Sequence, residues 1–512
     1  MYLKPIMGHI GSVLNQIFAP RIYVLASNGL TLFIFFCGSW WWRPRWLYAE
    51  WVPALIRQGL LSPTASPAYR EVSFTRFALS LFIVILFVLW ILSGLRGLRA
   101  AYRDGRLLWL IALGSVVTWT VFSIGWAADS EFIHDAQSAS VLADARSQAA
   151  QWVLVLLFAF VVVCNGPAPR LVALALVSGM IVQGAVGMLQ VALQHELGLA
   201  WLDGEIFKLG LHLYEFSLDP EESGIIVVQS EGIRYLRAYG ITPHPNMLAG
   251  SLVMGLLASL WLWLEHRRTA AWVTMFGLWA LFLTFSRAAV GGLVVGGAST
   301  IVGHYLSGYR RGFTAFAITV LLASLAFYVT FRPLVAVRVG QGNEGGASIE
   351  QISIEERHIY LEQAGQIIRQ HPWQGIGIGT FHWASYNMLR QAYPHYEVNG
   401  QSVHRIYYLA LAEVGLVGGV LVSGTLGIAA WLVWRRRWVL APETVALGGG
   451  VVAWLAIGWF EFYMWSLLPY QVLFWGTLAA VLVPVNVDGN DRVDRQVGED
   501  DLGRADPVAS DV

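Results

Sequence analysis

Three separate segments of the sequence place cationic or basic side chains beside apolar runs. Arg237 lies shortly before the apolar run that follows Asn246, and Arg287 lies between two apolar runs with almost no connecting loop. His404 ends a long polar segment directly before a further apolar run. A guanidinium can bind a phosphate through two parallel hydrogen bonds, and an imidazole can take a proton from a hydroxyl. Together these residues would suit a lipid-linked phosphate or diphosphate and a hydroxyl acceptor at a membrane boundary.

Each of these residues also has a purely structural interpretation. Arg237 could snorkel from a membrane-entry turn, with Asn246 capping the helix that follows. Arg287 could extend to lipid headgroups, and His404 could be a packed or capping histidine. Two acidic residues, Glu413 and Glu461, lie inside or at the end of apolar runs, and the sequence assigns them no role.

The segment from His371 to Phe381 is rich in glycine, with Gly375, Gly377 and Gly379 at alternate positions. It does not match a dinucleotide-binding fingerprint, because that motif needs a different spacing between a strand and a helix. The glycines are expected instead to permit close backbone packing or turns with positive φ.

The composition indicates the class of protein to which these charged and basic residues belong. Of 512 residues, 56% are hydrophobic and 13% are charged, about half of the roughly 25% that is usual in soluble domains. This excludes an ordinary soluble enzyme and a disordered chain. Lys+Arg and Asp+Glu balance at 33 each, so no net positive field favours nucleic acid as a partner. The 24 tryptophans suit membrane interfaces, and the sequence predicts an all-α, polytopic membrane protein in contact with the lipid bilayer.

Twelve membrane spans are predicted, since each needs about 20 mostly apolar residues. The residues between the seventh and eighth spans, Ser286 and Arg287, are expected to form a tight turn, because an arginine at the bilayer centre costs at least ~2.5 kcal/mol. The twelve ranges are 22–42, 78–95, 107–127, 149–165, 171–194, 246–264, 270–285, 288–306, 314–331, 406–434, 443–462 and 466–484.

Short loops rich in arginine set the expected orientation. The clusters at 96–106, 267–268, 310–311 and 435–437 fall on one side if there are twelve spans, which predicts that both termini are cytoplasmic. The predicted outer segments are then 43–77, which carries several arginines against this rule, 195–245 and 332–405.

Four regions follow from this topology. They are an N-terminal bundle of about nine spans (1–331), a large periplasmic loop (332–405), three C-terminal spans (406–484) and a disordered cytoplasmic tail (485–512). Within the loop, residues 354–370 are expected to form an amphipathic helix, and residues 1–21 lack a cleavable signal pattern. Cys37 and Cys164 are predicted to lie near opposite membrane faces without a disulfide.

The ordered motifs resemble one bacterial family. They are Arg-x-x-Gly and His-Pro-Asn-x-Leu-Ala within Arg237–Ala249, Ser-Arg-x-x-x-Gly at Ser286–Gly291, the glycine-rich segment at 371–381, and His404 leading to Glu413-x-Gly-Leu-x-Gly. This set is similar to the O-antigen ligase and O-antigen polymerase superfamily of envelope glycosyltransferases. The resemblance covers about 237–420 by motif and the whole chain by span pattern.

The resemblance implies a GT-C-like enzyme of the bacterial inner membrane with a periplasmic active face. The donor would be a glycan on undecaprenyl diphosphate, and no metal or other cofactor is expected. The acceptor hydroxyl would belong to lipid A–core in a ligase, to another glycan repeat unit in a polymerase, or to a protein in an O-oligosaccharyltransferase.

The family's roles can be carried over by motif. Arg237 and Arg287 would hold the diphosphate, and His404 would act on the acceptor hydroxyl. Arg405, His244 and Asn246 would contribute to substrate binding; at the position of Arg405 the family often has asparagine.

Two other classes of protein stay open. A lipid-linked glycan flippase or transporter would also have many spans, but the predicted spans contain almost no Arg or Lys, and the cations gather at the outer edge. A structural partner in an envelope complex is the other class. Among the enzymes, a ligase is preferred because the outer loop precedes only three final spans and the Ser-Arg motif is intact.

Overall fold

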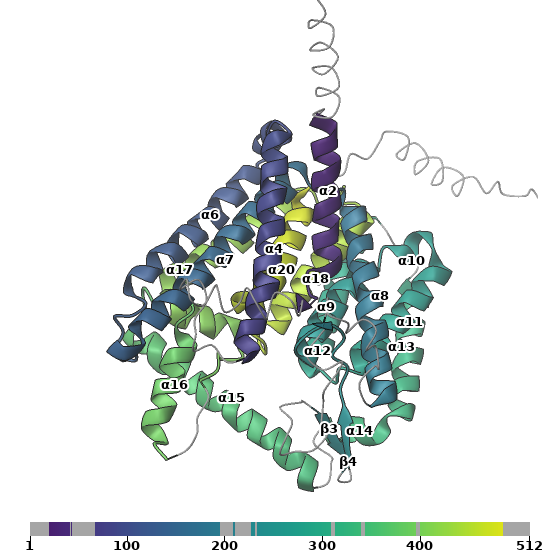
Figure 1. Ribbon diagram of the computed structural model, residues 1–512. Helices are drawn as coiled ribbons and strands as arrows, with labels where there is room; N and C mark the ends of the chain where they lie inside the picture. Colours follow the sequence, from purple (N-terminus) through teal and green to yellow (C-terminus); the bar gives the residue numbers. More distant parts are fainter. Residues whose placement is uncertain are drawn as a thin grey trace, which may run out of the picture.

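The computed structural model describes residues 20–40, 42–43, 67–194, 208–209, 227–230, 233–308, 313–338, 344–395 and 400–484. The predicted loop 43–77, the loop 195–245 and the tail 485–512 therefore lie wholly or largely outside the described residues. Within these ranges the chain is a bundle of long apolar helices (Figure 1).

The bundle has one helix for each of the twelve predicted spans. They are α2 (Pro20–Cys37), α4 (Pro67–Leu92), α6 (Arg106–Phe122), α7 (Ser138–Asn165), α8 (Pro169–Leu193), α9 (Pro245–Ala258), α11 (Arg267–Phe282), α12 (Arg287–Leu306), α13 (Phe313–Thr330), α17 (Ile406–Arg435), α18 (Pro442–Ile457) and α20 (Leu468–Leu482).

Length and hydropathy identify six stretches that could cross a membrane. They are Arg106–Trp126, Asp135–Asn165, Pro169–Leu193, Pro245–Glu265, Arg287–Leu306 and Ile406–Arg435. Five shorter apolar helices fall in α2, α4, α13, α18 and α20. The chain is therefore a helical, multi-pass membrane protein, and the count of twelve spans stays a prediction because α11 meets neither criterion.

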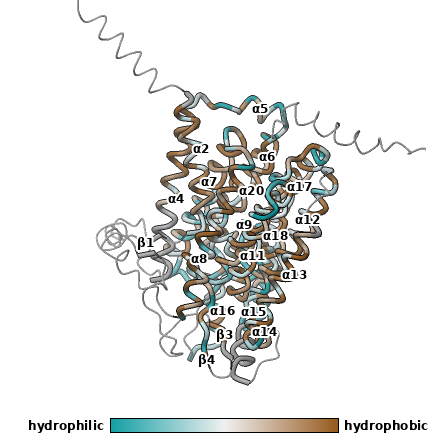
Figure 2. The backbone as a smooth tube through the Cα atoms, turned by 90° about the vertical axis from the view of Figure 1, so that its right-hand side faces the viewer, coloured by the Kyte–Doolittle hydropathy of each residue, from teal (hydrophilic) through white to brown (hydrophobic). Residues whose placement is uncertain are grey.

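Shorter elements cover the two ends of the bundle. The helices α14 (Arg332–Arg338), α15 (Glu344–Gln370) and α16 (Phe381–Ala392) lie at one end with the antiparallel hairpin β3 (Val227–Ser230) and β4 (Ile233–Leu236) (Figure 1). Figure 2 places the hydrophilic α5 (Leu98–Arg103) at the opposite end, with predominantly hydrophobic helices between. The predicted helix 354–370 is part of α15. The remaining elements are α10 (Leu262–Glu265), α19 (Tyr463–Ser466), the 3-10 turns η1 (Ser123–Trp126) and η2 (Asp135–Gln137), and the pair β1 (Trp42–Arg43) and β2 (Lys208–Leu209).

Polar contacts join the loop of Arg436 and Arg437 to neighbouring segments at one end of the bundle. The Arg436 guanidinium donates to the carbonyl of Leu482 at 3.0 Å, and the Ser307 hydroxyl donates to the carbonyl of Arg437 at 2.8 Å. Arg170 pairs with Glu265 at 2.8 Å. The orientation of this end relative to the cell stays a prediction, and Arg310 and Arg311 lie outside the described residues. Both cysteines are free.

The predicted glycine-rich turn packs into a break in α17. Gly375, Gly377 and Gly379 all have positive φ, as expected, and Gly415 inside α17 has φ 66°. The backbone N–H of Gly377 donates to the Glu413 carbonyl at 2.8 Å, and the Glu413 carboxylate accepts from the Trp465 indole at 2.7 Å. The loop helices are therefore fixed to the membrane bundle through this segment.

Candidate active site

Arg237 is buried directly after strand β4, with 3% of its surface exposed. Its Nε donates to the carbonyl of Thr284 at 2.6 Å, and its Nη2 donates to Oδ1 of Asn246 at 2.7 Å. A buried guanidinium needs such partners because desolvation penalises an unpaired charge. Arg237 is therefore a fixed internal cation and does not snorkel to headgroups.

Two glutamines of α8 hold the turn that carries Arg237. The Gln190 side chain accepts from the N–H groups of Tyr239 and Gly240, at 3.1 and 2.8 Å, and donates to the Gly240 carbonyl at 3.0 Å. Gln183 accepts from the N–H of Ile241 at 2.7 Å. Both glutamines are buried, and their spacing of seven residues places them on one face of the helix. Membrane helices tolerate such polar residues only when each group finds a partner.

The expectation that Asn246 caps the following helix is wrong. His244 is the N-cap of α9, and its Nδ1 accepts from the backbone N–H of Asn246 at 3.0 Å. Proline at position 245 suits the first helical position because its missing N–H needs no partner there. The Asn246 side chain is left to bridge two charged groups, accepting from Arg237 and donating through Nδ2 to Oε1 of Glu461 at 2.6 Å.

Glu461 completes this chain from the loop after α18. It is 4% exposed, and burial raises the pKa of its carboxyl to about 7, against smaller lowering effects of Arg357, Asn246 and Arg237. The carboxyl thus has two cations within electrostatic reach, Arg237 after β4 and Arg357 on α15. The sequence marked Glu461 as an acid at the end of a span but could not show which groups surround it.

Arg287 is the first residue of α12 and is exposed. The predicted tight turn is present: α11 ends at Phe282, and Phe285 has φ 51°. The backbone N–H of Ala238 donates to the Leu283 carbonyl at 3.0 Å, so the turn before Arg287 is bonded directly to the Arg237 segment. The exposed guanidinium lies at the positive end of a 20-residue helix, which also favours an anion.

His404 lies just before α17 and is half-buried. Its ring packs edge-on against Phe462 with centroids 5.2 Å apart, and its Nδ1 is buried with no hydrogen-bond partner within the described part of the chain. Burial, and then the charge of Arg357, lowers the pKa of His404 to about 4. The imidazole is therefore neutral at physiological pH and can accept a proton.

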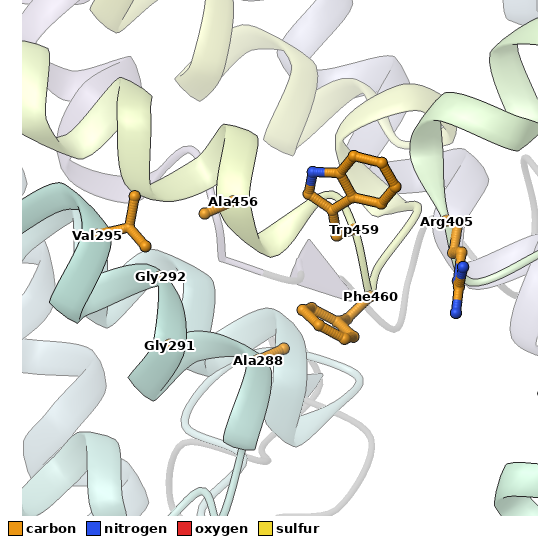
Figure 3. A pocket seen from close by; sticks show the side chains of 8 residues that line it. All are labelled: Ala288, Gly291, Gly292, Val295, Arg405, Ala456, Trp459 and Phe460. Atoms are coloured by element: carbon orange, nitrogen blue, oxygen red, sulfur yellow. The ribbon is translucent and has the colours of Figure 1, made fainter.

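The start of α17 is bound to the end of α18. The N–H of Ile406 donates to the Gly458 carbonyl at 2.9 Å, and the Tyr407 hydroxyl donates to the Leu455 carbonyl at 2.6 Å. Arg405 lines a pocket of about 380 Å³, together with residues of α12, α18 and the loop after it (Figure 3). The other lining residues are Ala288, Gly291, Gly292, Val295, Ala456, Trp459 and Phe460.

The structure brings the predicted segments together around Glu461. Arg237, His244 and Asn246 form one hydrogen-bonded group with it, His404 packs on the neighbouring Phe462, and the turn before Arg287 is bonded to the Arg237 segment. Sequence reasoning missed Arg357, because its position on α15 gave no sign that its charge acts on Glu461.

Other histidines of the large loop make different contacts. His371 pairs with Glu131 at 2.9 Å and His382 with Asp144 at 3.4 Å, both on the segments around η2 and α7. In the ranges described, no group of three or more His, Cys, Asp or Glu side chains is placed to hold a metal ion.

Comparison with known proteins identifies the family of this region. No curated protein matches the chain. Residues 272–423, from α11 into α17, match the family model described as O-Antigen ligase, whose members are glycosyltransferase-like ligases and polymerases. The matched range contains Arg287, His404 and Arg405, and Arg237 and Glu461 lie outside it. The match confirms the resemblance seen in the motifs, and it supports membership of the O-antigen ligase and polymerase superfamily for residues 272–423.

Proposed function

We propose that the protein transfers a glycan from undecaprenyl diphosphate to an acceptor hydroxyl at the periplasmic face of the bacterial inner membrane, as an O-antigen ligase does. The observation that carries this proposal is the buried chain Arg237–Asn246–Glu461, with His404 beside it and Arg287 at the adjoining turn. Cations near an unpaired, neutral imidazole suit a diphosphate leaving group and a hydroxyl nucleophile.

The two arginines have different parts in this proposal. Arg287 is exposed and would bind the diphosphate oxygens directly, whereas Arg237 is held by Thr284 and Asn246 and would act as a fixed positive charge. Charge that is already in position when the leaving group departs is the most effective form of electrostatic catalysis.

His404 would complete the reaction on the acceptor side. The acceptor oxygen attacks the anomeric carbon, its proton passes to the neutral imidazole, and the bond to the diphosphate oxygen breaks with its electron pair. A single displacement of this kind inverts the anomeric configuration. An axial product from an axial donor would rule out the single displacement.

The test is glycan transfer by purified Arg287→Ala and His404→Ala proteins that insert normally in the membrane. Loss of transfer in both supports the assigned roles, and full activity in both removes these residues from catalysis. Arg268→Ala is the matched control, because Arg268 is also an exposed arginine at the start of a helix, α11.

A polymerase of the same superfamily would use the same donor with a different acceptor. Deletion in the source bacterium, followed by gel analysis of surface glycans, distinguishes the two. Full-length polymer retained on the lipid carrier indicates a ligase, and glycan that stops at one repeat unit indicates a polymerase. Glycan retained on the cytoplasmic side would indicate a transporter.

A further inference from the structure

The segment between α18 and α20, residues 458–466, carries two groups of the candidate site. Glu461 bonds to Asn246, and the Phe462 ring packs against His404. The segment is short and includes the four-residue helix α19. The contacts that hold its two ends therefore decide where both groups lie relative to His404.

One helix, α17, holds this segment at both ends. At the start, the backbone N–H of Ile406 donates to the carbonyl of Gly458 at 2.9 Å. Near the end, the indole N–H of Trp465 donates to Oε2 of Glu413 at 2.7 Å. Ile406 and Glu413 are seven residues apart, so they lie on the same face of α17, about 10 Å apart along its axis. Because His404 lies two positions before the helix, α17 positions both His404 and the segment.

Trp465 connects Glu413 to the candidate site. Both residues are buried, with 3% of the surface of each exposed. The backbone N–H of Trp465 donates to the carbonyl of Phe462 at 2.9 Å. Its indole packs edge-on against Trp152 of α7 with centroids 5.0 Å apart, and its carbonyl accepts from Gln148 of α7 at 2.8 Å. Trp465 is therefore held by α7 on one side, and the hydrogen bond to Glu413 joins it to α17.

The other carboxyl oxygen of Glu413 binds the outer segment. Oε1 accepts from the backbone N–H of Phe381, the first residue of α16, at 3.4 Å, and the Glu413 carbonyl accepts from Gly377 at 2.8 Å. A Cβ on Gly375 would lie 2.5 Å from that carbonyl oxygen, so the turn packs tightly on this residue. Burying a carboxyl group costs free energy unless its oxygens are hydrogen-bonded, and here the two oxygens bind two different segments. Glu413 therefore joins the outer helices to the segment of Glu461.

We propose that Glu413 is a positioning residue for glycan transfer. It acts through Trp465, which holds Phe462 against His404, and it touches neither substrate. This inference rests on the proposed function and adds to it a residue from the interior of the bundle. Because the proposed diphosphate contact is Arg287, on a different helix, loss of Glu413 slows the chemical step and leaves donor binding unchanged.

The test measures transfer of undecaprenyl-diphosphate-linked glycan to lipid A–core by the full-length protein in detergent micelles. Glu413→Leu removes both acceptor oxygens at similar side-chain size, and Trp465→Phe removes the donor. Each change is expected to lower kcat about tenfold or more with an unchanged KM for the glycan donor, since a displacement of about 1 Å can lower a rate by about 10²-fold. The double variant should be no slower than either single variant, because both changes break the same interaction. Glu413→Gln, which keeps one acceptor oxygen, should have an intermediate kcat.

Two buried side chains away from this contact serve as matched controls. Glu443 at the start of α18 is 9% exposed, and the indole of Trp263 is likewise buried and hydrogen-bonded. Glu443→Leu and Trp263→Phe should leave kcat unchanged. Hydrogen exchange of residues 458–466, followed by mass spectrometry, is a second measurement that needs no substrate. It should become faster in Glu413→Leu and Trp465→Phe and stay at the wild-type rate in both controls.

The outcomes separate this proposal from the proposed function. Wild-type kcat in Glu413→Leu, or a double variant whose loss is the product of the two single losses, overturns the positioning role. A raised KM with unchanged kcat would show that Glu413 acts on donor binding and also overturns it. If the unaltered protein transfers no glycan to lipid A–core, the proposed ligase function fails. Hydrogen exchange then decides the positioning role alone: faster exchange of residues 458–466 in Glu413→Leu supports it, and wild-type exchange overturns it.

Discussion

Asn246 and Glu461 are hydrogen-bonded at 2.6 Å although 215 positions of the sequence separate them. One lies at the start of α9 and the other after α18, and Arg237 is bound to the far side of the same asparagine. The amide thus connects a buried cation to a buried acid. Five predictions test how this arrangement and its surroundings work.

Replacement of Arg237 is expected to reduce both stability and glycan transfer. Arg237→Ala leaves the Asn246 side chain and the Thr284 carbonyl without their donor, and loss of one partner of a buried charged group costs about 3 kcal/mol. Transfer should fall by about 10²-fold or more. Thermal unfolding in detergent and a transfer assay measure the two effects.

Arg287→Ala should separate these effects. Because Arg287 is exposed, its removal is expected to leave the melting temperature unchanged and to reduce transfer by about 10²-fold. An unstable Arg287→Ala protein, or a stable Arg237→Ala protein, would contradict the proposal that Arg287 binds the substrate directly while Arg237 is a fixed internal charge.

Glu461→Gln is expected to change how stability depends on pH. Burial raises the folded-state pKa from its ordinary 4.5 to about 7, so between these values the folded state keeps a proton that the unfolded state has lost. This contribution to stability falls as pH rises through that window. The glutamine variant should therefore gain stability relative to the wild type from pH 5 to pH 8; a constant difference would show that Glu461 does not titrate there.

The acidic limb of transfer should depend on His404. Burial lowers its pKa from 6.5 to about 4, so the neutral base persists below the usual range and is lost only as pH falls through about 4. The wild-type rate should therefore show no inflection near pH 6.5 that depends on His404, that is, none that disappears in the His404→Ala protein. His395→Ala is the control, because His395 lies exposed on the same outer segment, and its pH profile should match the wild type.

Gly415→Ala is expected to destabilise the break in α17. Gly415 has φ 66°, and a Cβ there would lie 2.2 Å from the Trp373 carbonyl oxygen; the left-handed conformation alone costs about 1–2 kcal/mol for a residue with a side chain. In the same helix, Gly424→Ala meets open space and should stabilise by up to about 1 kcal/mol. Equal melting temperatures for the two variants would contradict this account.

The helices were predictable because their signal is local. Each span needs a continuous apolar run, so the break between α11 and α12 could be placed at Ser286 and Arg287 from one cation alone. Residues 354–370 were likewise predictable as a helix from their periodicity, whereas the full extent of α15 from Glu344 was not.

The site was predictable only in part, because its contacts are distant in sequence. Arg237, Arg287 and His404 stood out as polar groups beside apolar runs. The partner of Asn246 could not be deduced, since its side chain bonds to a glutamate in the distant loop after α18 and a local cap was the simplest expectation. Gln183 and Gln190 could have indicated a polar contact inside the bundle, because two amides on one face of a predicted span need polar partners.

The hydrogen bonds between the glycine-rich segment and the break in α17 have a consequence for protein engineering. Leu416 and Val417 donate their backbone N–H groups to Pro372 and Trp373, while Ile376 donates to Ala412. The glycine-rich segment and the first turns of α17 are therefore held together by hydrogen bonds in both directions. A chimera that exchanges the outer helices between relatives will need to transplant the first turns of α17 together with them.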